Sequence, residues 1–170
     1  MKFYFMLLML ALMSNLSTAA QTGNKPANVI DGAKNPELIP QLEAYKSLFT
    51  NLAEGPSPGG MSFGYSYLKP ANLSKEEMNI VIRASNRYKL SVDEAGDKMI
   101  KLKKENPTRP YPQNVWNQFY GILSSLDVTA EELRRDIERD ISLEAFQKLD
   151  RLVETKVKSS MEFIKGNRQQ

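Results

Sequence analysis

The side chains best suited to binding or chemistry lie in two short stretches of the chain. The first stretch offers oxygen atoms from Asp31, Asn35 and Glu37, which can recognise a partner or a ligand. The same residues also suit a structural role, in which Asp31 forms a turn, Asn35 caps a helix and Glu37 lies at the positive end of that helix. Both interpretations stay open, and we take Asp31, Asn35 and Glu37 as candidate partner-binding residues.

The second stretch is an aromatic segment within residues 55–70, which contain four glycines and three prolines. This composition predicts an irregular loop rather than a helix. Phe63, Tyr65 and Tyr67 are unusual in a linker, and aromatic side chains on a Gly-rich loop resemble adaptable recognition surfaces. Alternatively, the rings pack into the core and hold the loop in place. These three residues form the second group of candidate partner-binding residues, with their burial left open.

Histidine and cysteine are both absent from the 170 residues. Their absence excludes disulfides, thiolate or imidazole metal ligands, and nucleophilic mechanisms that need a Cys or a His base. The 20 acidic residues allow carboxylate pairs, but no calcium-loop spacing appears, and a glycosidase-like pair depends on a separation that only a structure supplies. The residue types therefore predict no enzyme, no cofactor and no metal site.

The charged residues are nearly balanced in sign. The formal net charge is +3, and it falls to +2 without the first 20 residues, which contain one lysine. We therefore expect no nucleic acid partner, although the pI is about 9.0. A run of lysines, Lys98, Lys101, Lys103 and Lys104, can contact an anionic surface. It is more typical of a solvated helix end, where positive charge suits the helix dipole.

Apolar residues at three- and four-residue spacing predict an all-α fold, a small bundle of about four to five helices in a single domain over residues 36–165. The first helix should begin between Pro36 and Pro40 and end before Gly55. One long helix is expected over about 75–105, because a capping box at Ser74–Glu77 precedes an uninterrupted apolar pattern from Met78 to Leu102.

The remaining helices are expected over 113–126, over 129–140 and from 142 onward. A second capping box at Thr129 separates the first two, unless they form one continuous helix. No strand pattern is present. The inner faces of the first, third and last helices are predicted to contain Leu42, Tyr45, Leu48, Phe49 and Leu52; Val115, Trp116, Phe119, Tyr120 and Leu123; and Phe146, Leu149, Leu152, Val153, Val157 and Ile164.

Residues 1–20 have the three-part pattern of a secretory signal peptide. Lys2 gives a positive start, residues 3–13 are apolar, and small residues surround the expected cleavage site after Ala20, or after Ala19. The apolar run is too short to cross a bilayer, so we expect no transmembrane span in the mature chain. Residues 21–35 are expected to form an extended lead-in. The prediction is an exported protein, periplasmic or secreted in a bacterium.

Two motifs resemble known proteins. Residues 30–40, Ile-Asp-Gly-Ala-Lys-Asn-Pro-Glu-Leu-Ile-Pro, are similar to the opening of small exported bacterial proteins of unknown function. Residues 141–150, with Val157-Lys158 after them, resemble the closing helix of those proteins, with Ile141 and Ala145 replacing an expected leucine and glycine. The resemblance implies export and a helical fold, and it implies no activity or ligand.

These observations favour an exported, non-catalytic helical protein that binds a protein or another component of the envelope or exterior. Two alternatives belong to other classes. One is a periplasmic chaperone or stress protein, which would present a concave apolar face on a helical hairpin. The other is a small hydrolase or lyase that uses carboxylates and tyrosines.

Overall fold

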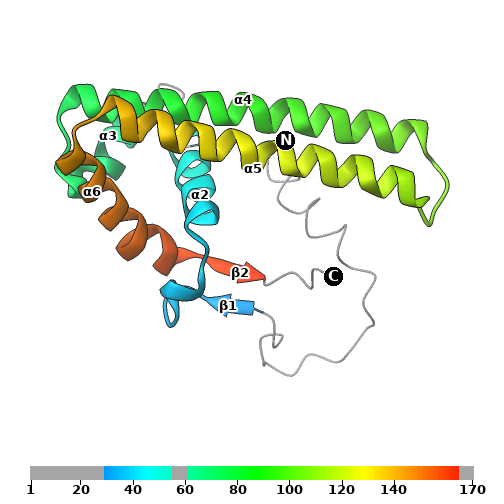
Figure 1. Ribbon diagram of the computed structural model, residues 1–170, viewed down its shortest axis with the longest axis horizontal. Coiled ribbons are helices and arrows are strands. Elements are labelled where there is room, and N and C mark those ends of the chain that lie inside the picture. The colour runs from blue at the N-terminus through cyan, green and yellow to red at the C-terminus, as the bar shows by residue number, and fades with distance from the viewer. Residues whose placement is uncertain (1–28, 55–60, 165–170) are drawn as a thin grey trace.

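Figure 1 shows the computed structural model of the chain, which describes residues 29–54 and 61–164. The predicted signal peptide and most of the predicted lead-in lie outside these residues. The all-α fold class is confirmed, because helices make up most of the described chain. The helices are α2 (Gln41–Ala53), α3 (Met61–Leu68), α4 (Lys75–Glu105), α5 (Gln113–Asp140) and α6 (Leu143–Leu152), with short turns η1 (Pro36–Leu38), η2 (Lys69–Ala71), η3 (Val153–Val157) and η4 (Lys158–Ser160).

A long antiparallel pair of helices, α4 and α5, dominates the molecule (Figure 1). The 31 residues of α4 span about 46 Å at 1.5 Å per residue. Its predicted capping box is confirmed: the Ser74 hydroxyl accepts a hydrogen bond from the Glu77 N–H at 3.2 Å, and the Glu77 carboxylate accepts one from the Ser74 N–H at 2.8 Å. The long helix therefore begins where the sequence predicts.

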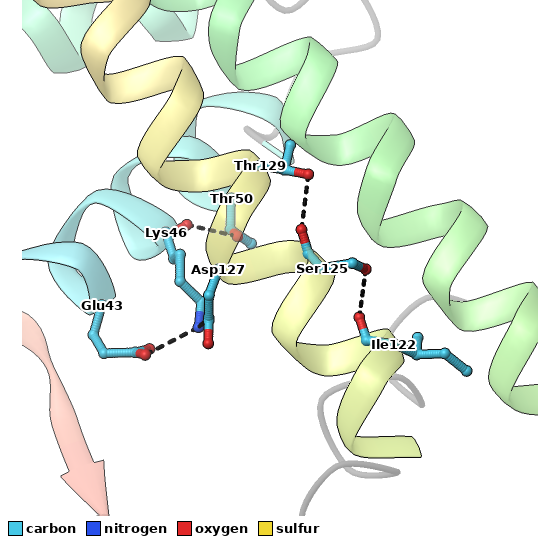
Figure 2. A network of polar contacts seen from close by, with 7 residues as sticks. All are labelled: Glu43, Lys46, Thr50, Ile122, Ser125, Asp127 and Thr129. Carbon is cyan, nitrogen blue, oxygen red and sulfur yellow. Dashed lines mark hydrogen bonds and ion pairs between the residues drawn. The ribbon is translucent and has the colours of Figure 1, made fainter. Parts of the chain in front are cut away.

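The structure decides between one and two helices over residues 113–140, because α5 is continuous. The Thr129 hydroxyl donates to the Ser125 carbonyl, one turn earlier, at 2.9 Å instead of capping a new helix (Figure 2). Buried Leu126, Ala130 and Leu133 continue a single apolar stripe through this region. Packing of that stripe outweighs the local capping signal, so the second capping box is not used.

The loop predicted over residues 55–70 is wrong for its second half, where Met61–Leu68 form the helix α3. Gly64 in α3 faces α4 so closely that a Cβ atom there would lie 2.8 Å from the Ile82 Cδ1 atom. Glycine disfavours helices because it gains backbone freedom when unfolded. Here its missing side chain allows α3 to pack tightly on α4, and this contact compensates for the low helix propensity.

A two-stranded antiparallel sheet joins the two ends of the described chain, contrary to the prediction of no strands. Strand β1 (Val29–Asp31) pairs with β2 (Glu162–Ile164) in a register that places Val29 opposite Ile164. Ile164 is half-exposed in this strand, so its predicted place on the inner face of the last helix is wrong. Three-residue strands are too short to show an alternating pattern, and only their pairing across the fold defines them.

The buried side chains form two separate clusters. The main core lies where α2, α3, α4, α5 and α6 meet, and it includes Tyr45, Phe49, Tyr88, Leu133 and Leu149. The second cluster contains only residues of α4, α5 and their connection: Met99, Leu102, Tyr111, Val115 and Phe119. Its residues lie in the part of the hairpin that extends beyond α2, α3 and α6 (Figure 1). We call residues 96–125 the arm and the other described residues the body.

Candidate interaction surfaces

Asp31, Asn35 and Glu37 lie at the start of the described chain, just before α2. The Asp31 carboxylate accepts a hydrogen bond from the Ala33 N–H at 3.1 Å, so the predicted turn is present. The Asn35 side chain makes no capping hydrogen bond, and Glu37 is exposed in the 3-10 turn η1. The first long helix, α2, begins only at Gln41. The predicted cap is therefore absent, because a 3-10 turn and Pro40 separate Asn35 from the helix.

Phe63, Tyr65 and Tyr67 are all half-buried on α3. The Tyr65 hydroxyl donates to the side-chain oxygen of Asn79 on α4. The Lys156 ammonium lies 4.6 Å from the centroid of the Tyr67 ring, and the rings of Phe63 and Tyr67 are 5.8 Å apart. Tyr65 and Tyr67 also pack against the main core. Both tyrosines therefore contribute to the packing of α3.

The structure does not bring the two predicted groups together. Asp31, Asn35 and Glu37 precede the N-terminal end of α2, whereas α3 follows its C-terminal end. The 13 residues of α2, a helix about 20 Å long, lie between the two groups in the chain. Figure 1 shows β1 and α3 on opposite ends of α2. The six candidates therefore form two sites rather than one surface.

A charged cluster joins α2 to α5. The Lys46 ammonium lies 3.0 Å from the Glu43 carboxylate and 2.7 Å from the Asp127 carboxylate (Figure 2). Burial acts to lower the pKa of Lys46, but the hydrogen bonds to Asp127 and Glu43 outweigh it and raise the pKa above its usual value. Beneath this cluster, burial raises the pKa of Tyr88 to about 12. The ion pair between Lys46 and Asp127 therefore holds α2 against α5.

A second polar cluster joins α2 to α6 and α5. The Tyr45 hydroxyl donates to the Asp150 carboxylate at 2.6 Å, and the same oxygen accepts from Gln41 at 3.3 Å. The Arg134 guanidinium lies between two rings, 5.6 Å from Tyr45 and 5.5 Å from Phe146. Burial, followed by the bond to Asp150, raises the pKa of Tyr45 well above its usual range. Gln41 Oε1 and Arg134 Nε are buried without a hydrogen-bond partner among the described residues. The remaining contacts hold helix junctions together, so we assign this cluster a structural role.

The described chain offers no basis for a metal centre or a membrane span. Within residues 29–54 and 61–164, no group of three or more acidic side chains is arranged to hold a metal ion. None of the helices in these ranges combines the length and the apolar character required to cross a bilayer.

The arm presents an aromatic surface that the sequence pattern did not predict. Asp127 and Arg134 of α5 contact residues of α2, and Tyr120 lies seven residues before Asp127, on the same side of α5. The side that α2 covers in the body is therefore uncovered in the arm. Tyr120 was predicted to face inward but is 61% exposed. Its ring stacks on the half-buried Trp116 at 6.2 Å.

We call Trp116, Tyr120 and Leu123 the arm face. Trp116 and Leu123 are half-buried against the second cluster, so both side chains are held in place while part of each stays accessible. No charged residue occurs in residues 113–126. Protein interfaces are typically enriched in aromatic residues and depleted in charge at their centre. The uncharged run is visible in the sequence, but only the hairpin geometry shows that Tyr120 is exposed.

No family model, no curated protein and no solved structure matches this chain. The contacts and charges of the described residues therefore carry the functional argument.

Proposed function

We propose that the protein is exported and binds a protein partner of the cell envelope or exterior through the arm face, without catalysis. The observation that carries the proposal is the exposed Tyr120 ring within an uncharged stretch of a projecting hairpin. Export rests on the pattern of residues 1–20. Aromatic residues that are rigidly held and partly exposed suit recognition, because little side-chain freedom is lost on binding.

The arm face is favoured over the aromatic residues of α3 for a physical reason. Tyr65 and Tyr67 already have partners within the fold, Asn79 and Lys156. A partner that engaged these rings would have to compete with those contacts. Tyr120 contacts only Trp116 among the aromatic rings of the described residues, and most of its surface is exposed. A binding partner can therefore cover Tyr120 without disturbing the fold.

A photo-crosslinking experiment in the native host tests the surface. A photoreactive side chain placed at position 120 should crosslink to a discrete partner. The same group at position 143 serves as the control, because Leu143 is 70% exposed but lies on α6 in the body. Equal labelling from both positions would contradict the assignment of the arm face.

An affinity measurement with the crosslinked partner then tests the contribution of the ring. Aromatic residues at the centre of an interface typically contribute at least about 2 kcal/mol, which corresponds to about thirtyfold in Kd. We expect Tyr120→Ala to weaken binding by about this factor and Leu143→Ala to leave Kd unchanged. An unchanged Kd for Tyr120→Ala would refute the role of this side chain.

Export is tested separately, by fractionation of the host and mass spectrometry of the protein. We expect a mature chain that begins at Gln21, or at Ala20, outside the cytoplasm. Recovery of the full chain from the cytoplasm would contradict export and leave the arm-face experiment interpretable, because the two measurements do not depend on each other.

A chaperone-type function is the second candidate, since the arm also exposes Ile100 (43%) besides Tyr120. Such a protein would bind unfolded chains through exposed apolar side chains of this kind. It should suppress aggregation of an unfolded client, and Tyr120→Ser should reduce that effect. No suppression at molar excess would exclude this function.

A further inference from the structure

The end of the arm contains a group of basic side chains that are not part of the arm face. Lys101, Lys103 and Lys104 lie in the last turns of α4, and Arg109 lies in the segment that connects α4 to α5. At 1.5 Å per residue, the three lysines lie within about 6 Å of the end of α4. We call these four residues the arm tip.

Acidic residues are nearly absent around the arm tip. Glu105 is the single acidic residue between Lys98 and Leu126. On α5 the first carboxylate is Asp127, about 21 Å along the helix from Gln113. Asp97 lies one turn before Lys101, but its neighbour Lys98 offsets its charge. Because the Debye length is about 8 Å at physiological ionic strength, Glu105 is then the acidic residue that offsets the four positive charges locally. The arm tip therefore has a net charge of about +3 on this length scale.

The contacts within the described residues leave most of this charge unneutralised. Lys101 pairs with Glu105 at 3.9 Å, and both side chains are largely exposed. Lys103, Lys104 and Arg109 have no ion pair within residues 29–54 and 61–164. Lys103 and Arg109 lie close enough that burial and the charge of Arg109 together lower the pKa of Lys103. Two neighbouring cations without a carboxylate indicate a surface that can accept an anion from outside.

The directions of the lysines indicate the shape of that anionic partner. Successive residues of an α-helix are rotated by about 100°, so Lys101 and Lys104 lie on one side of α4 while Lys103 points about 100° or more away from both. A partner that lay along the arm could reach only one or two of them. A broad surface across the end of the hairpin can approach all three, together with the exposed Arg109.

The helix dipoles do not alter this conclusion. The C-terminal end of α4 and the N-terminal end of α5 meet at the arm tip, where their opposite partial charges largely offset each other. The side chains therefore determine the local potential. The body contains 14 basic and 18 acidic residues, but it begins about 15 Å from the end of α4 and is screened at that distance.

We propose that the arm tip binds the surface of a membrane rich in anionic phospholipids, with the hairpin end against the lipid phosphates. This site is distinct from the arm face and does not depend on a protein partner there. Ammonium and guanidinium groups recognise phosphate through charge-assisted hydrogen bonds. Each basic residue near an anionic surface contributes about fivefold to the partition constant, so three net charges contribute about a hundredfold.

Vesicle sedimentation with the protein purified from its host tests the proposal. Vesicles of phosphatidylglycerol and phosphatidylcholine should bind the protein about a hundredfold more strongly than vesicles of phosphatidylcholine alone at physiological salt. Raising the salt concentration should weaken binding. The triple variant Lys101→Gln/Lys103→Gln/Lys104→Gln should lose about a hundredfold in the partition constant. Glutamine keeps the helix propensity, so circular dichroism should show unchanged helical content.

A matched variant separates the arm tip from total charge. Lys34→Gln/Lys69→Gln/Lys75→Gln removes the same three charges from exposed body lysines that have no ion pair in the described residues. It should change partitioning by less than about fivefold. Because every variant shares the same N-terminus, any apolar insertion of that segment cancels from the comparison. Equal losses for the two triple variants would overturn the proposal.

Two further outcomes distinguish other anionic partners. Inorganic phosphate, at the same phosphate concentration as the vesicles, should leave vesicle binding intact, because single phosphates cannot span the arm tip. Full displacement by phosphate would overturn a membrane surface in favour of a discrete phosphate site. Sedimentation without vesicles should give the same oligomeric state for wild type and for the arm-tip variant. Self-association that disappears in that variant would assign the arm tip to a second copy instead.

Discussion

The separation of the core into two clusters predicts that Phe119→Ala opens the arm without unfolding the body. Phe119 is 3% exposed and lies in the second cluster, where its ring centroid is 5.5 Å from Tyr111 and 5.8 Å from Trp116. Only five buried side chains hold this cluster together, and none of them belongs to α2, α3 or α6. The arm is therefore a separate unit that can open locally.

The expected magnitude follows from the loss of one buried phenyl ring. Replacement of a buried phenylalanine by alanine costs about 3–5 kcal/mol in a well-packed core. The arm can relax more easily than the body, so we expect about 3 kcal/mol. Since about 1.4 kcal/mol corresponds to tenfold, the opening equilibrium of the arm should increase by about two orders of magnitude.

Amide hydrogen exchange measured by mass spectrometry resolves the two parts of the hairpin. In Phe119→Ala, peptides from residues 99–119 should exchange about a hundredfold faster, while peptides from residues 81–88 and 143–152 keep their wild-type rates. Phe49→Ala is the matched control, because Phe49 is fully buried in the main core. It should accelerate exchange in α2 and in the body half of α4. A uniform increase in Phe119→Ala would refute the separation and show one cooperative unit.

Four other substitutions test further contacts of the fold, three in the body and one, at Gly121, in the arm. Lys46→Met should lower the free energy of unfolding, measured by urea denaturation, by about 2 kcal/mol, because it leaves the partly exposed carboxylates of Glu43 and Asp127 unpaired. An unchanged free energy would contradict the role of the Lys46 ion pairs. Gly32→Ala should cost about 2 kcal/mol, because the new Cβ would lie 1.8 Å from the Lys158 carbonyl oxygen. Gly121→Ala has open space around the new Cβ and should stabilise the protein by up to about 1 kcal/mol. Equal shifts of the urea midpoint in Gly32→Ala and Gly121→Ala would refute the argument that close packing at Gly32 causes the loss. Burial raises the pKa of Tyr45 above 10.0, so its contribution to stability is complete below pH 10 and is lost as the pH rises further. The free energy of unfolding should therefore fall less steeply with alkaline pH in Tyr45→Phe, and an identical slope in the two proteins would contradict this reasoning.

The long helix α4 and the start of α6 are predictable from local sequence. In α4, the capping box at Ser74 and the regular apolar spacing from Met78 to Leu102 coincide with the observed helix. The same reasoning predicts the Ser142 cap of α6, whose hydroxyl accepts from the Ala145 N–H at 3.2 Å. These features depend on residues within one or two helical turns, so the chain determines them without reference to the rest of the fold.

The candidate surfaces are less predictable, because exposure depends on what packs alongside. Tyr120 has the spacing of an inward residue, and it is exposed because α2 covers only the body half of α5. Tyr111 lies between two prolines in the segment that connects α4 to α5, yet it is buried in the second cluster. Neither position has a local signal for its environment. The exposure of Tyr120 depends on where α2 crosses the hairpin, and the burial of Tyr111 depends on how the ends of α4 and α5 pack together.

The sequence by itself determined the all-α class, the long helix over 75–105 and the absence of any histidine or cysteine chemistry. The tertiary structure decided that α5 is continuous, that Met61–Leu68 are helical, and that β1 pairs with β2 across the whole described chain. It also decided that the hairpin extends past the body as an arm. The physical reason is the sequence separation over which each interaction acts. Helix caps and helical periodicity depend on residues a few positions apart. Strand pairing, the approach of Gly64 to Ile82 and the exposure of Tyr120 depend on contacts between distant segments.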